Sequence, residues 1–174
     1  MDFMAKLTII RGYPGSGKTT LGKMLQNSGF GVFIDHNEIL TFVASIAGDD
    51  EGIYENIADL EKAIARKLLL LGRDVVVARG FSSQTSVASY QEIAQEAHAE
   101  HLILRLETSE QVLSARVQSP ERQKDFNPTI TPSALSAWIK DNPIEDVTIE
   151  QIVDANKSID DVFNQACSFI RPPA

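Results

Sequence analysis

The chain has 174 residues, of which 43% are hydrophobic, and a formal charge of −8. This length suits a single domain, residues 1–174, with a sizeable core, and the acidic balance weighs against a long nucleic-acid footprint, which needs a basic face. One cysteine, Cys167, excludes an intramolecular disulfide and a secreted disulfide scaffold, and no apolar run approaches a membrane span, so we expect a cytoplasmic protein.

The first predicted elements are a strand at residues 6–11 and a helix at residues 18–28, joined by a glycine-rich turn. The strand is a nearly continuous apolar run, which is typical of a parallel strand covered on both faces. Together the elements read LTIIRGYPGSGKTT, which contains the pattern GxxxxGK[ST]. The motif therefore sits in the strand-to-helix context that a phosphate loop requires.

Each residue of the motif has a physical task. Glycines at 12, 15 and 17 allow backbone N–H groups to approach phosphate oxygens closely. Lys18 would place its charge on the β- and γ-phosphates, and the Thr19 hydroxyl would join the shell of a bridging Mg²⁺ ion. The positive end of the helix dipole points at the same anion. The stretch predicts binding of ATP or GTP, with contacts from Gly12, Tyr13, Pro14, Gly15, Ser16, Gly17, Lys18, Thr19 and Thr20.

Strands and helices alternate along the rest of the chain. Further strands are predicted at residues 31–35, 74–78, 101–106 and 149–154, and further helices at 37–47, 51–71, 83–97, 108–118, 133–141 and 159–170. Ser83 or Thr85 would cap one helix, and Thr108 or Ser109 another. Residues 119–132 are polar and punctuated by proline, which indicates a lid. Right-handed crossovers predict a three-layer α/β/α P-loop NTPase fold with a five-stranded, mainly parallel sheet.

A second motif must distinguish the classes of P-loop protein. Residues 49–52 spell DxxG, as in GTPases, but they follow a helix rather than a strand, and residues 156–160 miss NKxD by one position. The third strand lacks the terminal acid of large ATPases and ends at the cation Arg79. Acids instead end the second and fifth strands, at Asp35 and Asp154. Because ligands lie at the carboxyl ends of parallel strands, these positions matter most.

The phosphate loop RGYPGSGKTT and the order of elements resemble small P-loop phosphotransferases of the polynucleotide kinase, zeta toxin, gluconate kinase and shikimate kinase type. The resemblance implies an Asp-x-Asp sequence after the second strand, where one carboxylate orients Mg²⁺ and one receives the acceptor's proton. Here the sequence is Asp35-His36-Asn37, and an amide cannot take a proton. Three interpretations follow: Asp35 performs both tasks, Glu38 substitutes, or the protein binds nucleotide and transfers slowly or not at all. We favour Asp35.

The resemblance also implies arginines that close over the phosphates, for which Arg116 on a helix and Arg122 in the lid are the candidates. Arg79 would face the acceptor, where it holds an anionic substrate or pairs with Asp35. Asn156 follows the fifth strand, where the resemblance places a loop that touches the adenine, although a simple turn is the stronger interpretation. Residues 37–61 would form most of the acceptor pocket, and Trp138 would pack under the lid.

These observations predict an ATP-dependent kinase that moves the γ-phosphoryl group to a hydroxyl of a small molecule or nucleotide. Lys18, Asp35, Arg116 and Arg122 would be catalytic, Asp35, Asn37 and Arg79 would contact the acceptor, and Thr19 and Asp35 would hold Mg²⁺. Two alternatives are a nucleotide-binding regulator without transfer activity and a zeta-toxin-like kinase. The acceptor, the choice between ATP and GTP, and the oligomeric state stay open.

Overall fold

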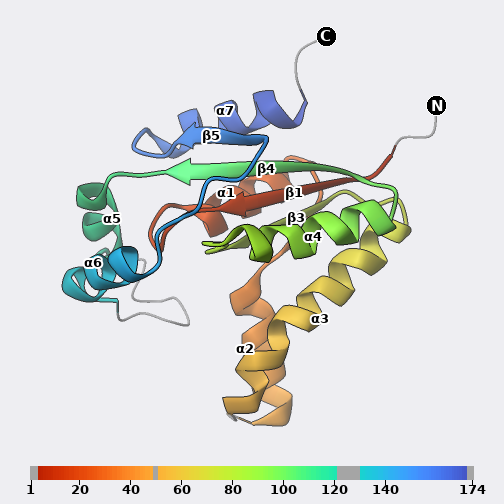
Figure 1. The fold of residues 1–174 in the computed structure, drawn as a ribbon, viewed down its shortest axis with the longest axis horizontal. Helices are drawn as coiled ribbons and strands as arrows, with labels where there is room; N and C mark the ends of the chain where they lie inside the picture. The colour runs from red at the N-terminus through yellow and green to blue at the C-terminus, as the bar shows by residue number, and fades with distance from the viewer. Residues whose placement is uncertain (1–3, 49–50, 121–129, 172–174) are drawn as a thin grey trace.

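The computed structural model describes residues 4–48, 51–120 and 130–171, and for residues 51–56 the backbone alone. Its five strands are all parallel and lie in the order β2-β3-β1-β4-β5 (Figure 1). The strands are β1 (Lys6–Arg11), β2 (Val32–Ile34), β3 (Val75–Arg79), β4 (Glu100–Glu107) and β5 (Glu150–Asp154). The helices are α1 (Lys18–Asn27), α2 (His36–Ala47), α3 (Glu51–Leu70), α4 (Gln84–Glu96), α5 (Glu110–Val117), α6 (Pro132–Asp141) and α7 (Ile159–Ile170).

The central strand β1 explains the three layers, because successive side chains of a strand point to opposite faces. Leu7 and Ile9 pack into one apolar cluster with buried residues of α3 and α4. Ile10 packs into a second cluster with Leu21 of α1 and Val162 of α7. Both faces of the sheet are therefore covered, and the predicted α/β/α fold with a five-stranded parallel sheet is confirmed.

Side-chain caps set the starts of most helices. Asp35, Ser83, Ser109, Thr131 and Ser158 each accept a hydrogen bond from a backbone N–H in the first turn of the helix that follows. Of the capping alternatives that the sequence left open, the structure uses Ser83 and Ser109. Predicted and observed element boundaries agree within two residues because caps and apolar periodicity are local signals.

Helices α2 and α3 pack against one another and extend away from the sheet as an arm (Figure 1). The apolar side of α2 therefore meets the sheet only near its start. Leu40 is buried, whereas Phe42 and Ile46 are 64% and 70% exposed. Within the described residues, no helix is both long enough and apolar enough to cross a bilayer.

Candidate active site

The phosphate loop has the backbone that its glycines predict. Gly12, Gly15 and Gly17 have φ angles of 153°, 84° and 97°, in the region that side chains disfavour. A Cβ atom on Gly12 would also lie 2.8 Å from the Ser16 hydroxyl and 3.0 Å from the carbonyl of Leu106. Lys18 Nζ donates to the carbonyls of Gly12 and Tyr13, at 2.9 and 2.8 Å. The lysine thus crosses the loop at the start of α1, where backbone N–H groups attract an anion.

A cavity of about 740 Å³ opens beside this loop. Residues 14–20 form one side of it, and Asp35, His36 and Asn37 come from the junction of β2 and α2. The end of β3 adds Ala78, Arg79 and Gly80, and helices α5, α6 and α7 add Arg116, Trp138 and Val162. The structure therefore brings most of the predicted site residues to one cavity at the carboxyl edge of the sheet.

Asp35 is almost completely buried and both of its carboxylate oxygens have partners. Oδ1 accepts a hydrogen bond from the backbone N–H of Asn37 at 3.0 Å, which caps α2. Oδ2 lies 3.3 Å from Lys23 Nζ, and the same amine lies 3.0 Å from Glu38. The hydrogen bond with Glu38, followed by the pairing with Asp35, raises the pKa of Lys23. Glu38 is itself 71% exposed, which leaves Asp35 as the carboxylate at the cavity.

Glu61 of α3 is a functional candidate that the sequence analysis missed. Its buried carboxylate contacts His36 Nδ1 at 2.5 Å and Arg79 Nη1 at 3.1 Å, and it accepts a hydrogen bond from the Tyr90 hydroxyl at 3.4 Å. Burial, together with the negative charge of Glu61, raises the pKa of Tyr90 far above its usual value. Of the two alternatives for Arg79, the ion pair with Asp35 is wrong, because Arg79 pairs with Glu61. Its contact with an anionic substrate stays a prediction.

A signal for Glu61 was present in the sequence. It lies four residues after Ile57 and three before Ile64, so it falls on the apolar side of a helix where a charged residue is unusual. The prediction that residues 37–61 form most of the acceptor pocket is too broad. Of that segment's described side chains, Asn37 alone lines the cavity, because the arm turns away from the sheet.

The three remaining predicted site residues, Arg116, Arg122 and Asn156, differ in where they lie relative to the cavity. Arg116 lines the cavity, and its Nη1 lies 3.4 Å from the carbonyl of Ser16. Arg122 lies outside the described residues. Asn156 forms a turn: its side chain accepts from the N–H of Ser109 at 2.8 Å and donates to Asp154 at 2.9 Å. It does not line the cavity, so its contact with a nucleotide stays a prediction.

Trp138 lines the cavity and also meets the ring of Tyr13 edge to face, with centroids 5.9 Å apart. The Tyr13 hydroxyl accepts a hydrogen bond from the N–H of Ile144 at 3.2 Å. The phosphate loop is thereby tied to α6 and to the connector that follows it. Residues 121–129 of the predicted lid, under which Trp138 was expected to pack, lie outside the described residues.

The comparison with protein families adds a decisive observation, since residues 7–140 match the model of an AAA domain. The chain belongs to this family. A search of curated proteins finds no match. Solved structures show the small P-loop kinase fold of this AAA domain across nearly the whole chain.

Three of these structures illustrate the likeness. A gluconokinase from Sinorhizobium meliloti 1021 is 17% identical, with a TM-score of 0.66 over 98% of this chain and 93% of that one. The APS kinase CysC of Mycobacterium tuberculosis, in complex with AMPPNP and APS, is 16% identical, with a TM-score of 0.60 over 96% of this chain and 98% of that one. A sugar kinase from Janibacter sp. HTCC2649 is 13% identical, with a TM-score of 0.64 over 95% of this chain and 94% of that one.

The AAA domain offers oxygen ligands for Mg²⁺ at its cavity, since Thr19 and Asp35 both line it. No group of three or more histidine, cysteine or acidic side chains gathers into a metal site within the part of the chain that the structure describes. Mg²⁺ in kinases is held by one or two protein oxygens together with substrate phosphates and water. The two residues therefore fit this ion.

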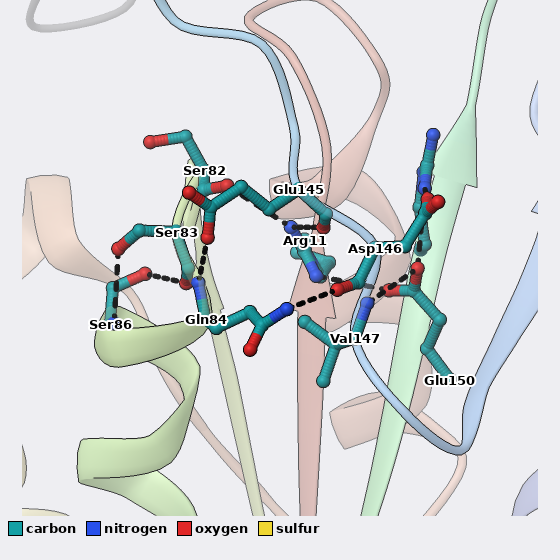
Figure 2. A network of polar contacts seen from close by, with 10 residues as sticks. Arg11, Ser82, Ser83, Gln84, Ser86, Glu145, Asp146, Val147 and Glu150 are labelled. Atoms are coloured by element: carbon teal, nitrogen blue, oxygen red, sulfur yellow. Dashed lines mark hydrogen bonds and ion pairs between the residues drawn. The ribbon is translucent and has the colours of Figure 1, made fainter.

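A buried arginine links the phosphate-loop strand of the AAA domain to the far edge of its sheet. Arg11 is fully buried, and its Nη1 lies 3.1 Å from Glu150 of β5, which Arg105 also contacts at 3.2 Å (Figure 2). Its Nη2 donates to the carbonyl of Glu145 at 2.8 Å. Burial lowers the pKa of Arg11, and the opposing charge of Glu150 counteracts this effect.

The same network holds the connector between α6 and β5 against the start of α4. The N–H of Gln84 donates to the Glu145 carboxylate at 2.7 Å, and the Gln84 amide donates to the carbonyl of Asp146 at 3.0 Å (Figure 2). The loop that follows β1 therefore begins from a strand end anchored by charged groups on two sides.

Proposed function

We propose that this protein is an ATP-dependent kinase that transfers the γ-phosphoryl group to a hydroxyl of a small molecule or nucleotide. One observation carries this proposal: a single cavity joins the phosphate loop to the carboxyl ends of β2 and β3. Its volume of about 740 Å³ leaves room beyond the loop for a second substrate. The structural neighbours named as gluconokinase, APS kinase and sugar kinase support the same reaction class.

The cavity residues have separate roles in this reaction. Lys18 and the loop amides hold the β- and γ-phosphates, and Arg116 approaches from α5 to offset charge in the transition state. The acceptor oxygen forms a bond to the γ-phosphorus while the bond to the β–γ bridging oxygen breaks, and ADP leaves with that electron pair. Asp35 orients the hydroxyl and takes its proton. Bound Mg²⁺, with Thr19 and Asp35 in its shell, would neutralise phosphate charge.

A nucleotide-binding regulator is the second candidate, and the environment of Asp35 favours it. Both carboxylate oxygens are already engaged, by the N–H of Asn37 and by Lys23, and the neighbouring position holds an amide instead of a base. A protein of this kind would bind ATP tightly and transfer its phosphoryl group slowly or not at all. Positioning alone accounts for much of phosphoryl transfer, so these features do not exclude a kinase.

Incubation with γ-labelled ATP and a panel of hydroxyl compounds separates the two candidates. The kinase forms a labelled product, whereas the regulator binds ATP without any transfer. We expect Lys18→Ala to weaken ATP binding about 10- to 100-fold, because one charge-assisted hydrogen bond is lost. Lys62→Ala, at a cation of α3 outside the cavity, is the matched control. Unchanged ATP affinity in Lys18→Ala would contradict the proposed phosphate site.

A further inference from the structure

Among the described residues, three lysine and arginine side chains line the cavity, and they occupy two different environments. Lys18 and Arg116 contact carbonyls of the phosphate loop, so they belong to the side that faces the nucleotide. Arg79 lies at the end of β3, beside His36 and Asn37, on the side left for the acceptor. The charge that an acceptor meets there depends on what surrounds Arg79.

Glu61 lies behind Arg79 and compensates its charge. The Glu61 side chain is only 2% exposed, whereas those of Arg79 and His36 are 30% and 31% exposed. Dissolved ions screen a partly buried pair much less than an exposed one, so the Glu61 carboxylate compensates much of the charge of Arg79. Arg79 consequently presents N–H donors to the cavity without presenting an uncompensated positive charge.

The other groups on this side are also suited to hydroxyls. The Asn37 amide provides two donors and an acceptor. His36 uses Nδ1 for Glu61, which leaves Nε2 for a ligand. Asp35 adds negative charge that Lys23 offsets. A carboxylate or phosphate beside Arg79 would lose hydration while the guanidinium there already faces the Glu61 carboxylate.

We propose that the phosphoryl acceptor is an uncharged polyhydroxy compound, and that Glu61 sets this preference by neutralising Arg79. The inference rests on the proposed kinase activity and names the substrate class of the same site. Glu61 is a positioning residue in this scheme, since it acts through Arg79 and His36. Hydroxyl groups can pair with Arg79, Asn37 and His36 at the same time without bringing a charge.

Transfer from labelled ATP by the wild-type protein tests the substrate class. The probes are neutral and anionic compounds of similar size: ribose against ribose 5-phosphate, and glucose against gluconate. We expect kcat/KM for the neutral member of at least one pair to exceed that for its anionic partner by about tenfold or more. Equal rates or a preference for the anionic members in both pairs overturns this inference and leaves the kinase proposal intact. Transfer to another compound of the hydroxyl panel but to none of these probes also overturns this inference alone. ATP binding without transfer to any compound of that panel overturns the kinase proposal and this inference with it.

The variant Glu61→Gln tests the role of the carboxylate. Glutamine keeps the size and a hydrogen-bonding oxygen but removes the charge that compensates Arg79. We expect the ratio of anionic to neutral kcat/KM to rise about tenfold, mainly through KM. Asp59→Asn removes the same charge from a position on α3 that is 79% exposed, and it should leave the ratio unchanged.

A purely structural role for Glu61 would lower both rates by one factor and keep their ratio, and that result overturns the assignment. If Glu61→Gln does not fold, the wild-type comparison still decides the substrate class. Arg79→Gln then serves as the second variant, with the same neutral and anionic probes. Loss of the cation should lower kcat/KM for the anionic probes no more than kcat/KM for the neutral ones. A selective loss of the anionic acceptor would contradict a neutralised Arg79.

Discussion

At the scale of single residues, this protein separates charged groups that line the cavity from charged groups that are buried outside it. Lys18, Asp35 and Arg79 line the cavity, whereas Glu61 and Arg11 do not line it and are almost fully buried. A buried charge costs free energy unless it is paired, and each of these two supporting residues has an ion-pair partner. The supporting residues therefore contribute order to the site rather than contacts to a ligand.

Cys167 of α7 illustrates a side chain whose role is packing. It lies against the cluster that contains Leu21 and Val162, and burial raises the pKa of its thiol. A raised pKa means less thiolate at a given pH, and the thiolate is the reactive form. We therefore expect iodoacetamide to alkylate the native protein at pH 8 more slowly than the urea-unfolded protein. Equal rates in the two states would show that the thiol is not protected.

At the scale of elements, the approach of α1 to the sheet depends on one glycine. Gly22 faces Phe33 of β2 so closely that a Cβ atom would lie 2.4 Å from the ring. Alanine normally stabilises a helix by about 1 kcal/mol relative to glycine. Here overpacking of about 1–3 kcal/mol opposes that gain. The contact with Phe33 therefore decides whether alanine at position 22 raises or lowers the free energy of unfolding.

We expect Gly22→Ala to lower the free energy of unfolding by about 1 kcal/mol in urea denaturation, the net of these two effects. The pair Gly22→Ala with Phe33→Leu serves as the control, because leucine lacks the ring atoms that clash. The double variant should lose less free energy of unfolding than the two single variants lose in sum. A stabilised Gly22→Ala protein would show that α1 moves away from β2 at little cost.

At the scale of the whole molecule, Arg11 joins parts of the chain that are far apart in sequence. It connects β1 to Glu150 of β5, 139 residues away, and to the connector at Glu145 (Figure 2). Glu150 also pairs with Arg105, so loss of Arg11 would not leave this carboxylate without a cation, but it would leave the carbonyl of Glu145 without its charged donor. Arg11 thus supports the central strand, the far edge of the sheet and the phosphate loop together.

Arg11→Met should lower the free energy of unfolding by about 1–3 kcal/mol, because the carbonyl of Glu145 loses its charged donor while Glu150 keeps Arg105 as a partner. Arg105→Met is the matched comparison, because Arg105 also contacts Glu150 but shares its charge with Asp146, which is 92% exposed. Arg105→Met should lose clearly less free energy of unfolding than Arg11→Met. Chemical denaturation of both variants measures this difference in the free energy of unfolding. Equal losses would contradict the claim that Arg11 stabilises the protein more than Arg105 does.

Much of this architecture was predictable from local patterns. The phosphate loop, the alternation of strands and helices, and the position of Asp35 at a strand end all follow from signals within short windows of sequence. Glycines at positive φ and side-chain caps act within a few residues of their own position. The sequence by itself therefore determined the class of fold and the nucleotide-facing half of the candidate site.

Tertiary structure decided the acceptor-facing half. The placement of β1 between β3 and β4, the pairing of Arg79 with Glu61 instead of Asp35, and the direction of the arm formed by α2 and α3 depend on contacts between distant segments. Local periodicity marked Glu61 as a charge on an apolar helix side but could not name its partner. Which charges meet in the interior depends on how the helices lie across the sheet, and only the packed chain determines that arrangement.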